Sequence, residues 1–269
     1  MLLLQKIFLF SLLALLFQQT PTNNKQELND QLFEAVRKGD AAAVTAALDK
    51  GADVNAKFRY GATALFKAAE RGHTDVANIL LERGADTKVK DTFYQATAMT
   101  WALSGNHVGV VRLILQKSAD DAEDVLMTGV RGNNDEFVKI ALERGGIKPE
   151  GLTVALAIAS SDPKKTATVE LLKKAGAAPP FEVDAATLQS LTGKYKGDPG
   201  PEMTMVIKEG KLVATGQGRP DLPLMPLDKT TFRPLTFDGA TFTFKIEGDK
   251  VVGIALKQGP NTTQMKRVE

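Results

Sequence analysis

The first half of this 269-residue chain repeats with a period of 33 or 34 residues, which constrains its fold more than any other feature. Gly39 and the triplet Gly51-Ala52-Asp53 recur 33 residues later, at Gly72 and Gly84-Ala85-Asp86. A further copy follows after 34 residues, and the matched pairs are Thr63 and Thr97, Ala68 and Ala102, His73 and His107, Leu81 and Leu115, and Asp86 and Asp120. Such a period is typical of arrays in which each copy packs against its neighbours.

Each copy has the pattern of two short helices. Thr63 is expected to cap the first helix through its hydroxyl, and Gly72 to end it in a left-handed conformation. Val76, Ile79 and Leu80 form the apolar stripe of the second helix, with the 3.6-residue period of an α-helix. Because one copy cannot bury its apolar face alone, the copies must stack.

The clearest copy runs Gly61-Ala-Thr-Ala-Leu-Phe-Lys-Ala-Ala-Glu-Arg-Gly-His73 and continues Asp75-Val-Ala-Asn-Ile-Leu-Leu-Glu-Arg-Gly-Ala-Asp86. These phrases resemble the ankyrin repeat. The resemblance implies an ankyrin solenoid over residues 25–180, with about five repeats whose outer copies are degenerate. It also implies recognition of a protein partner by the loop tips and the concave face of the first helices.

After Pro179-Pro180 the pattern changes to the alternation of β-strands. Residues 203–208 and 211–215 alternate on either side of Glu209-Gly210, and residues 241–247 and 251–256 flank Gly248-Asp249. Alternating runs joined by such turns predict hairpins. Residues 181–269 are therefore expected to form a small antiparallel β-barrel.

The sequence of this second half also resembles a known domain. Leu188, Gly193 and Tyr195, the run Met205-Val-Ile-Lys-Glu-Gly-Lys-Leu212 and the ending Met265-Lys-Arg-Val268 resemble a β-rich domain of unknown function. That domain commonly trails bacterial β-lactamase-like serine hydrolases. The resemblance implies a lipocalin-like half-barrel, a bacterial source and no catalytic residue. The expected fold class is α+β multidomain, a helical solenoid followed by a small barrel or half-barrel.

Residues 1–20 are predicted to be a signal peptide. A start containing Lys6 precedes eleven residues, Ile7–Phe17, which are apolar except for Ser11, and a polar stretch follows. The apolar run is shorter than the ~20 residues of a spanning helix. The alternative is that residues 1–17 remain as an inner-membrane anchor. In either case we expect an exported protein, periplasmic or secreted, that meets a membrane only through this segment.

Composition and motifs argue against catalysis. The chain has no cysteine and two histidines, which excludes thiol chemistry, cysteine-ligated zinc and iron–sulfur clusters. The net charge of +2 gives no electrostatic footprint for nucleic acid. Ser161-Asp-Pro-Lys164 has the Ser-x-x-Lys spacing of penicillin-recognising hydrolases, but Pro163 breaks the helical turn that the motif needs. We predict a monomeric protein that is not an enzyme and needs no cofactor or metal.

The loop tips carry the candidate partner-binding residues. Phe58-Arg59-Tyr60 and Thr92-Phe93-Tyr94 lie one period apart and contain the residue types that dominate binding hot spots. Carried over from the ankyrin family, the candidate set is Arg59, Tyr60, Glu70, Arg71, Phe93, Tyr94, Ser104 and Arg131. Phe58 and Trp101 fit packing between repeats equally well. Gln95 stands where the family has glycine, so the third copy departs from the pattern at this turn.

Two other functions fit the sequence. In one, the C-terminal β-domain binds a small apolar or cell-wall-derived ligand, and the helices only support it. In the other, the chain is an accessory or inhibitory subunit of a separate periplasmic hydrolase. The aromatic loop tips favour a protein partner for the repeats. The short strand sequence of residues 181–269 counts against a wide ligand-binding barrel.

Overall fold

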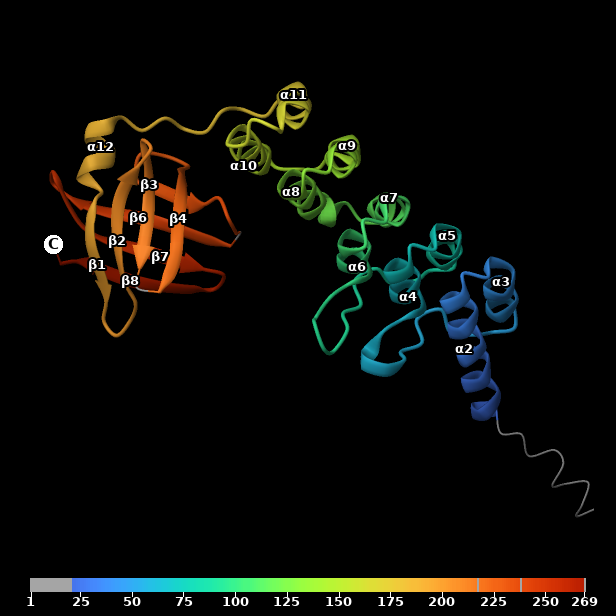
Figure 1. The fold of residues 1–269 in the computed structure, drawn as a ribbon. Helices are drawn as coiled ribbons and strands as arrows, with labels where there is room; N and C mark the ends of the chain where they lie inside the picture. The colour runs from blue at the N-terminus through green and yellow to red at the C-terminus, as the bar shows by residue number, and fades with distance from the viewer. Residues whose placement is uncertain (1–20, 217, 238, 269) are drawn as a thin grey trace, which may run out of the picture. The chain divides into compact units, whose positions relative to one another are not determined.

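The computed structural model describes residues 21–216, 218–237 and 239–268. The predicted signal peptide or anchor, residues 1–20, lies outside the described residues. Helices occupy the chain from Pro21 to Lys174, and strands follow from Gly193 to Arg267 (Figure 1). The fold is therefore α+β. Within the described ranges, no helix has the length and apolar character that crossing a membrane requires.

The helices come in pairs that follow the sequence repeats. The pairs are α2 (Pro21–Lys38) with α3 (Ala41–Asp49), α4 (Ala64–Arg71) with α5 (Thr74–Glu82), α6 (Ala98–Ser104) with α7 (Val108–Lys117), α8 (Ala122–Gly132) with α9 (Asp135–Arg144), and α10 (Pro149–Ser160) with α11 (Thr166–Lys174). Two short 3-10 helices, η1 (Arg59–Gly61) and η2 (Ala119–Asp121), lie in connecting loops. In the first three pairs, α2, α4 and α6 contact in series, and α3, α5 and α7 form a second layer.

The local signals of the sequence explain where these helices begin and end. The Thr63 side chain accepts a hydrogen bond from the N–H of Phe66 at 3.3 Å and so caps α4. Gly72 ends the same helix at φ 70°, in the left-handed region that favours glycine. Leu80 of α5 is fully buried. The predicted cap and stop are thus confirmed in this copy. Of the predicted stripe, Val76 and Leu80 are buried and Ile79 is half-buried, while Ala77 and Leu81 are buried as well.

Successive helix pairs approach closely where a glycine meets a histidine. Gly39 and Gly72 follow the first helices of two copies, both at positive φ. A β-carbon on Gly39 would lie 2.9 Å from the His73 ring, and one on Gly72 would lie 2.4 Å from Nδ1 of His107. The His107 Nε2 also lies 3.2 Å from the Glu70 carbonyl oxygen. Both histidines therefore pack between repeats.

Contacts divide the chain into two units, residues 1–128 with 140–146 and residues 129–139 with 147–269. This division runs through α8 and leaves the last helix pair in the same unit as the strands. The change from helix to strand lies between α11 and the first strand. Domain boundaries at 25–180 and 181–269 remain a prediction.

The strands form a closed barrel in sequential order. They are β1 (Gly193–Gly197), β2 (Glu202–Lys208), β3 (Lys211–Gly216), β4 (Arg219–Pro226), β5 (Thr231–Pro234), β6 (Ala240–Glu247), β7 (Lys250–Gln258) and β8 (Asn261–Arg267). Every neighbouring pair is antiparallel, and β1 pairs with β8 as well as β2. This last pairing closes the sheet, so the barrel and not the half-barrel is present.

A short helix, α12 (Ala185–Ser190), precedes β1 and packs against the barrel core through Leu188 and the following Leu191. The fully buried Tyr195 donates its hydroxyl to the Leu191 carbonyl at 2.8 Å. From β8, the Arg267 guanidinium donates to the carbonyl oxygens of Ser190 at 2.9 Å and Thr192 at 2.6 Å. These bonds join the first and last segments of the barrel.

The glycine–histidine contact predicts a difference between two alanine substitutions. Gly72→Ala and Gly84→Ala both place a β-carbon on a left-handed residue, at a cost of roughly 1–2 kcal/mol each. Around Gly84 the added atom meets nothing within 4 Å, whereas at Gly72 it meets His107. Gly72→Ala should therefore cost about 1–3 kcal/mol more, as overpacking does. Urea titration measures both losses. Equal losses would show that the His107 ring moves aside freely.

Candidate functional site

The site is built on two loops that connect successive helix pairs, residues 50–63 between α3 and α4 and residues 83–97 between α5 and α6 (Figure 1). The Phe58 N–H donates to the Ala62 carbonyl at 2.8 Å across the first tip, and the Asp91 N–H donates to the Ala96 carbonyl at 2.9 Å across the second. The Thr92 N–H donates to the Tyr60 carbonyl at 2.8 Å and links one tip to the other. The two tips therefore form one hydrogen-bonded surface.

A buried carboxylate organises the second tip. Asp91 Oδ1 accepts the N–H groups of Phe93 at 2.8 Å and Tyr94 at 2.5 Å, and its Oδ2 accepts the N–H of Ala96 at 3.0 Å. Burial raises the pKa of Asp91, but these donors outweigh it and lower the pKa below its ordinary value. Sequence reasoning missed this residue. An aspartate that bonds the backbone two residues on is a common turn signal and was available in the sequence.

The turn of the third copy keeps its shape without glycine. Gly61 in the first loop has φ 72°, and Gln95, one period later, adopts φ 55°. Tyr60 also lies in the left-handed region, at φ 60°. Residues with a β-carbon adopt this conformation at a cost and need surrounding structure to hold them there. The bonds of Asp91 and the link between the tips supply that structure.

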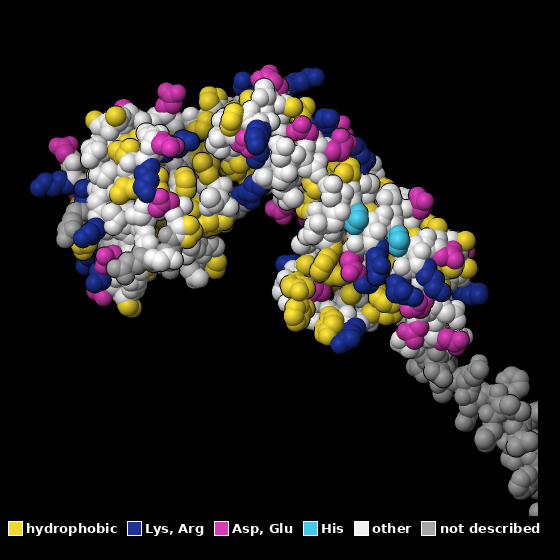
Figure 2. Space-filling model, in the orientation of Figure 1, with side chains coloured by type: hydrophobic (Ala, Val, Ile, Leu, Met, Phe, Trp, Pro, Cys, Tyr) yellow, Lys and Arg dark blue, Asp and Glu magenta, His cyan; other side chains and the backbone are white. Residues whose placement is uncertain are grey.

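Aromatic side chains from these tips surround an open pocket of about 450 Å³. The exposed fractions are 54% for Tyr60, 70% for Phe93 and 68% for Tyr94, which are high values for large apolar side chains. Phe93 and Tyr94 pack edge to face with ring centres 4.6 Å apart, and Tyr94 lies 5.9 Å from Trp101. Figure 2 shows hydrophobic side chains gathered over these loops.

Charged groups accompany the aromatic walls. The Arg59 guanidinium lies 4.7 Å from the centre of the Tyr60 ring, within the range of a cation–π interaction. Lys67 and Glu70, one helical turn apart on α4, form an ion pair and line the pocket. The pocket thus offers a large aromatic surface with an arginine and a paired lysine and glutamate.

The structure brings together most of the predicted partner-binding residues. Those that line the pocket are Arg59, Tyr60, Glu70, Phe93 and Tyr94. Arg71 is exposed on α4 but does not line it. Ser104, also exposed, donates its hydroxyl to the Thr100 carbonyl at 2.9 Å. Arg131 is exposed on α8, in the other contact unit, and does not line the pocket either.

Sequence reasoning missed several walls of the pocket. Phe33 of α2 reaches it and stacks on Phe58, with ring centres 4.1 Å apart. Phe66 of α4 lies 5.5 Å from Trp101, so Trp101 both packs between repeats and lines the pocket. Phe33 lies one 33-residue period before Phe66, so the repeat itself offered a signal that both rings occupy the same position.

The Ser-x-x-Lys sequence does not form a helical turn. Ser161 follows the last residue of α10 and donates its hydroxyl to the Ile158 carbonyl at 2.7 Å. Lys164 lies in the connection before α11, which begins at Thr166. In the part of the chain that the structure describes, no group of three or more His, Cys, Asp or Glu side chains is arranged to hold a metal ion.

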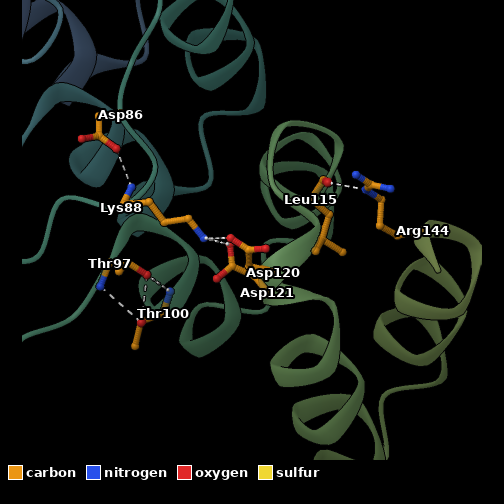
Figure 3. Close-up of polar contacts among 8 residues, drawn as sticks. All are labelled: Asp86, Lys88, Thr97, Thr100, Leu115, Asp120, Asp121 and Arg144. Carbon is orange, nitrogen blue, oxygen red and sulfur yellow. Dashed lines mark hydrogen bonds and ion pairs between the residues drawn. The ribbon is translucent and has the colours of Figure 1, made fainter. Parts of the chain in front are cut away.

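The acidic run after α7 joins neighbouring copies. Lys88 Nζ lies 3.3 Å from Asp120 Oδ2 and 3.6 Å from Asp121 Oδ2 (Figure 3). Partial burial lowers the pKa of Lys88, but the two carboxylates outweigh it and the pKa is raised. One copy further on, the Arg144 Nε donates to the Leu115 carbonyl at 2.8 Å. These side chains serve the packing of the repeats.

Comparison with known proteins names the repeat. A family model described as ankyrin repeats (3 copies) matches residues 10–91 and 32–124. The helix pairs of this region are ankyrin repeats. The match ends at residue 124, near the start of the fourth helix pair, and leaves the β-barrel outside it.

The similar curated proteins share only a segment with this chain. "Ankyrin repeat, SAM and basic leucine zipper domain-containing protein 1" of Otolemur garnettii is 33% identical over 98 residues, 35% of this chain and 21% of that protein. "Probable E3 ubiquitin-protein ligase XBOS33" of Oryza sativa subsp. japonica is 39% identical over 88 residues, 33% of this chain and 17% of that protein. The "2-5A-dependent ribonuclease" of Mus musculus is 42% identical over 72 residues, 25% of this chain and 10% of that protein.

The chain thus spans about a fifth, or less, of the length of these curated relatives. The family model identifies ankyrin repeats in this chain, and these indicate a module for protein–protein interaction. The ligase and ribonuclease names describe those whole proteins. All three relatives are eukaryotic, so a bacterial source rests on the resemblance of the C-terminal domain alone.

Asp91→Ala should loosen the second tip. Leaving its buried N–H partners unsatisfied should cost about 1–3 kcal/mol in urea unfolding, and amide hydrogen exchange at Phe93, Tyr94 and Ala96 should accelerate. Folding lowers the pKa of Asp91. Its contribution to the stability of the folded state is therefore present at pH values above its ordinary pKa of about 3.9, and is lost as the pH falls through the folded pKa. The difference in the free energy of unfolding between wild type and variant should therefore become smaller at acidic pH. Unchanged exchange at neutral pH would contradict this role.

Proposed function

We propose that the ankyrin repeats bind a protein partner through the aromatic pocket at the tips of their first two inter-repeat loops. The observation that carries the proposal is the exposure of Tyr60, Phe93 and Tyr94 around one open pocket of about 450 Å³. Exposed apolar surface gathered in one place is a mark of an interaction site. Covering these rings would remove apolar area from water, which favours association.

The rigidity of the tips supports the same proposal. Asp91 holds the backbone of Phe93 and Tyr94, and the Thr92–Tyr60 bond couples the loops, so the rings are positioned before a partner arrives. A site that is already ordered loses less conformational entropy on binding. Tyrosine and arginine are also enriched among the residues that dominate interface energies.

The chemistry of the pocket indicates which groups of a partner would fit it. Its aromatic walls suit an apolar side chain that enters the pocket, and the Arg59 guanidinium suits a carboxylate or carbonyl oxygen beside it. We propose that the chain acts in this way as a monomer, without catalysis. A periplasmic hydrolase as the partner would give the narrower, accessory or inhibitory form of this function.

The double change Tyr60→Ala/Tyr94→Ala tests the binding site. Partners are first identified by affinity capture with the wild-type protein, and their affinities are then measured by calorimetry. Truncating two hot-spot rings should weaken binding by ~2 kcal/mol or more, about thirtyfold in Kd. The tyrosines are exposed, so the circular dichroism spectrum should not change.

Phe181→Ala is the matched control, since this ring is 43% exposed and does not line the pocket. It should leave the affinity unchanged. If the double variant binds like the wild type while its spectrum is intact, the interface lies elsewhere. If its fold is lost, the two rings are structural.

We also propose that the protein is exported. The eleven residues Ile7–Phe17, apolar except for Ser11, support this proposal. N-terminal sequencing of protein recovered from the periplasm or medium should show the loss of about twenty residues. An intact Met1 on protein in the membrane fraction would favour the anchor, and an intact Met1 in the cytoplasm would contradict export.

A further inference from the structure

The interior of the β-barrel is filled unevenly. Tyr195 and Phe232 each pack edge to face on Phe244, with ring centres 5.8 and 5.6 Å apart, and all three are buried. Leu191, next to α12, joins the same core. Because α12 precedes β1, this aromatic cluster and the helix fill the end of the barrel at which β1 begins. An eight-stranded barrel has room for packed side chains or one small ligand.

At the other end of the barrel the inward side chains become smaller. Alternate residues of a strand face the same side, and on β3 the inward series runs Leu212, Ala214, Gly216. Across from this series, Phe242 and Leu256 are buried on β6 and β7. The antiparallel pairing places the end of β3 beside the starts of β2 and β4. The loss of side-chain volume along β3 therefore leaves space at this end.

That space is a cavity of about 360 Å³ that opens at the barrel mouth. Its walls are apolar: Met203, Ala214, Leu222, Phe242 and Leu256. Its rim is polar and includes Thr215, Thr236 and Gln258. An apolar cavity with a few polar groups at its edge has the general form of a small-molecule site.

The cavity walls indicate the class of ligand. An ion of either sign would lose its water among these apolar side chains. We propose that the barrel mouth binds a small, uncharged and largely apolar molecule. This site is separate from the aromatic pocket and does not depend on a protein partner.

Two fluorescent probes with the same aromatic frame test the proposal on the full chain. N-phenyl-1-naphthylamine is neutral, and 8-anilinonaphthalene-1-sulfonate adds a sulfonate. The neutral probe should bind saturably with a stoichiometry of one, and its affinity should exceed that of the anion by about tenfold or more. Tighter binding of the anion would overturn the ligand class, and no saturable binding of either probe would overturn the site.

Filling the cavity should weaken this binding. Ala214→Phe places a ring in the space and should weaken the neutral probe by about tenfold or more. Ala255→Phe is the matched control, because Ala255 lies between the inward residues Ile254 and Leu256 and faces the other side of β7. The control should bind like the wild type. Equal binding by both variants would place the probe outside the barrel.

A second substitution tests the same cavity in case the Ala214→Phe protein does not fold. At Gly216 a β-carbon would meet only the Glu202 carbonyl oxygen at 3.6 Å, an ordinary contact. Gly216→Leu should therefore fold, as judged by circular dichroism, and should also reduce probe binding. The Tyr60→Ala/Tyr94→Ala protein should bind the probe normally. Loss of probe binding in that protein alone would locate the apolar site at the ankyrin loops and contradict the proposal.

Discussion

Close contact between successive repeats is the constraint on which the helical half depends. No single helix pair can bury its apolar face, so each copy needs the next one. The contact is close because glycine stands where the neighbouring histidine packs, as at Gly72 and His107. The same glycine ends the first helix in a left-handed conformation that a β-carbon would strain. One residue type thus satisfies a local requirement of the helix end and a long-range requirement of the stack.

The stacking also sets the position of the binding surface. Because α4 and α6 lie side by side, the loops that enter them emerge next to each other and share a backbone hydrogen bond. Residues one period apart, such as Tyr60 and Tyr94, therefore lie around one pocket. Asp91 then fixes the second tip from within by accepting three backbone N–H groups. A surface of exposed rings is kept ordered by a buried charge.

The barrel uses packing in a different way. Its aromatic cluster around Phe244 and its last strand, tied to the segment before β1 by Arg267, complete the core at one end. The decrease in side-chain volume along β3, from Leu212 to Gly216, leaves the other end of the barrel unfilled. Space in a protein interior is normally occupied, because voids forfeit dispersion contacts. A cavity that strand residues leave open in this way is therefore a feature to be tested for binding.

The sequence by itself determined the parts that obey local rules. Repeat period, the Thr63 cap, the Gly72 stop, the hairpin turns and the exposed aromatic tips follow from residues within one turn or one period of each other. Tertiary structure alone decided that β1 pairs with β8 and that the space beside the end of β3 remains an open cavity. These features join residues far apart in the chain, where neither spacing nor alternation carries a signal. Their physical cause is the contact between surfaces that exist only once the elements have packed.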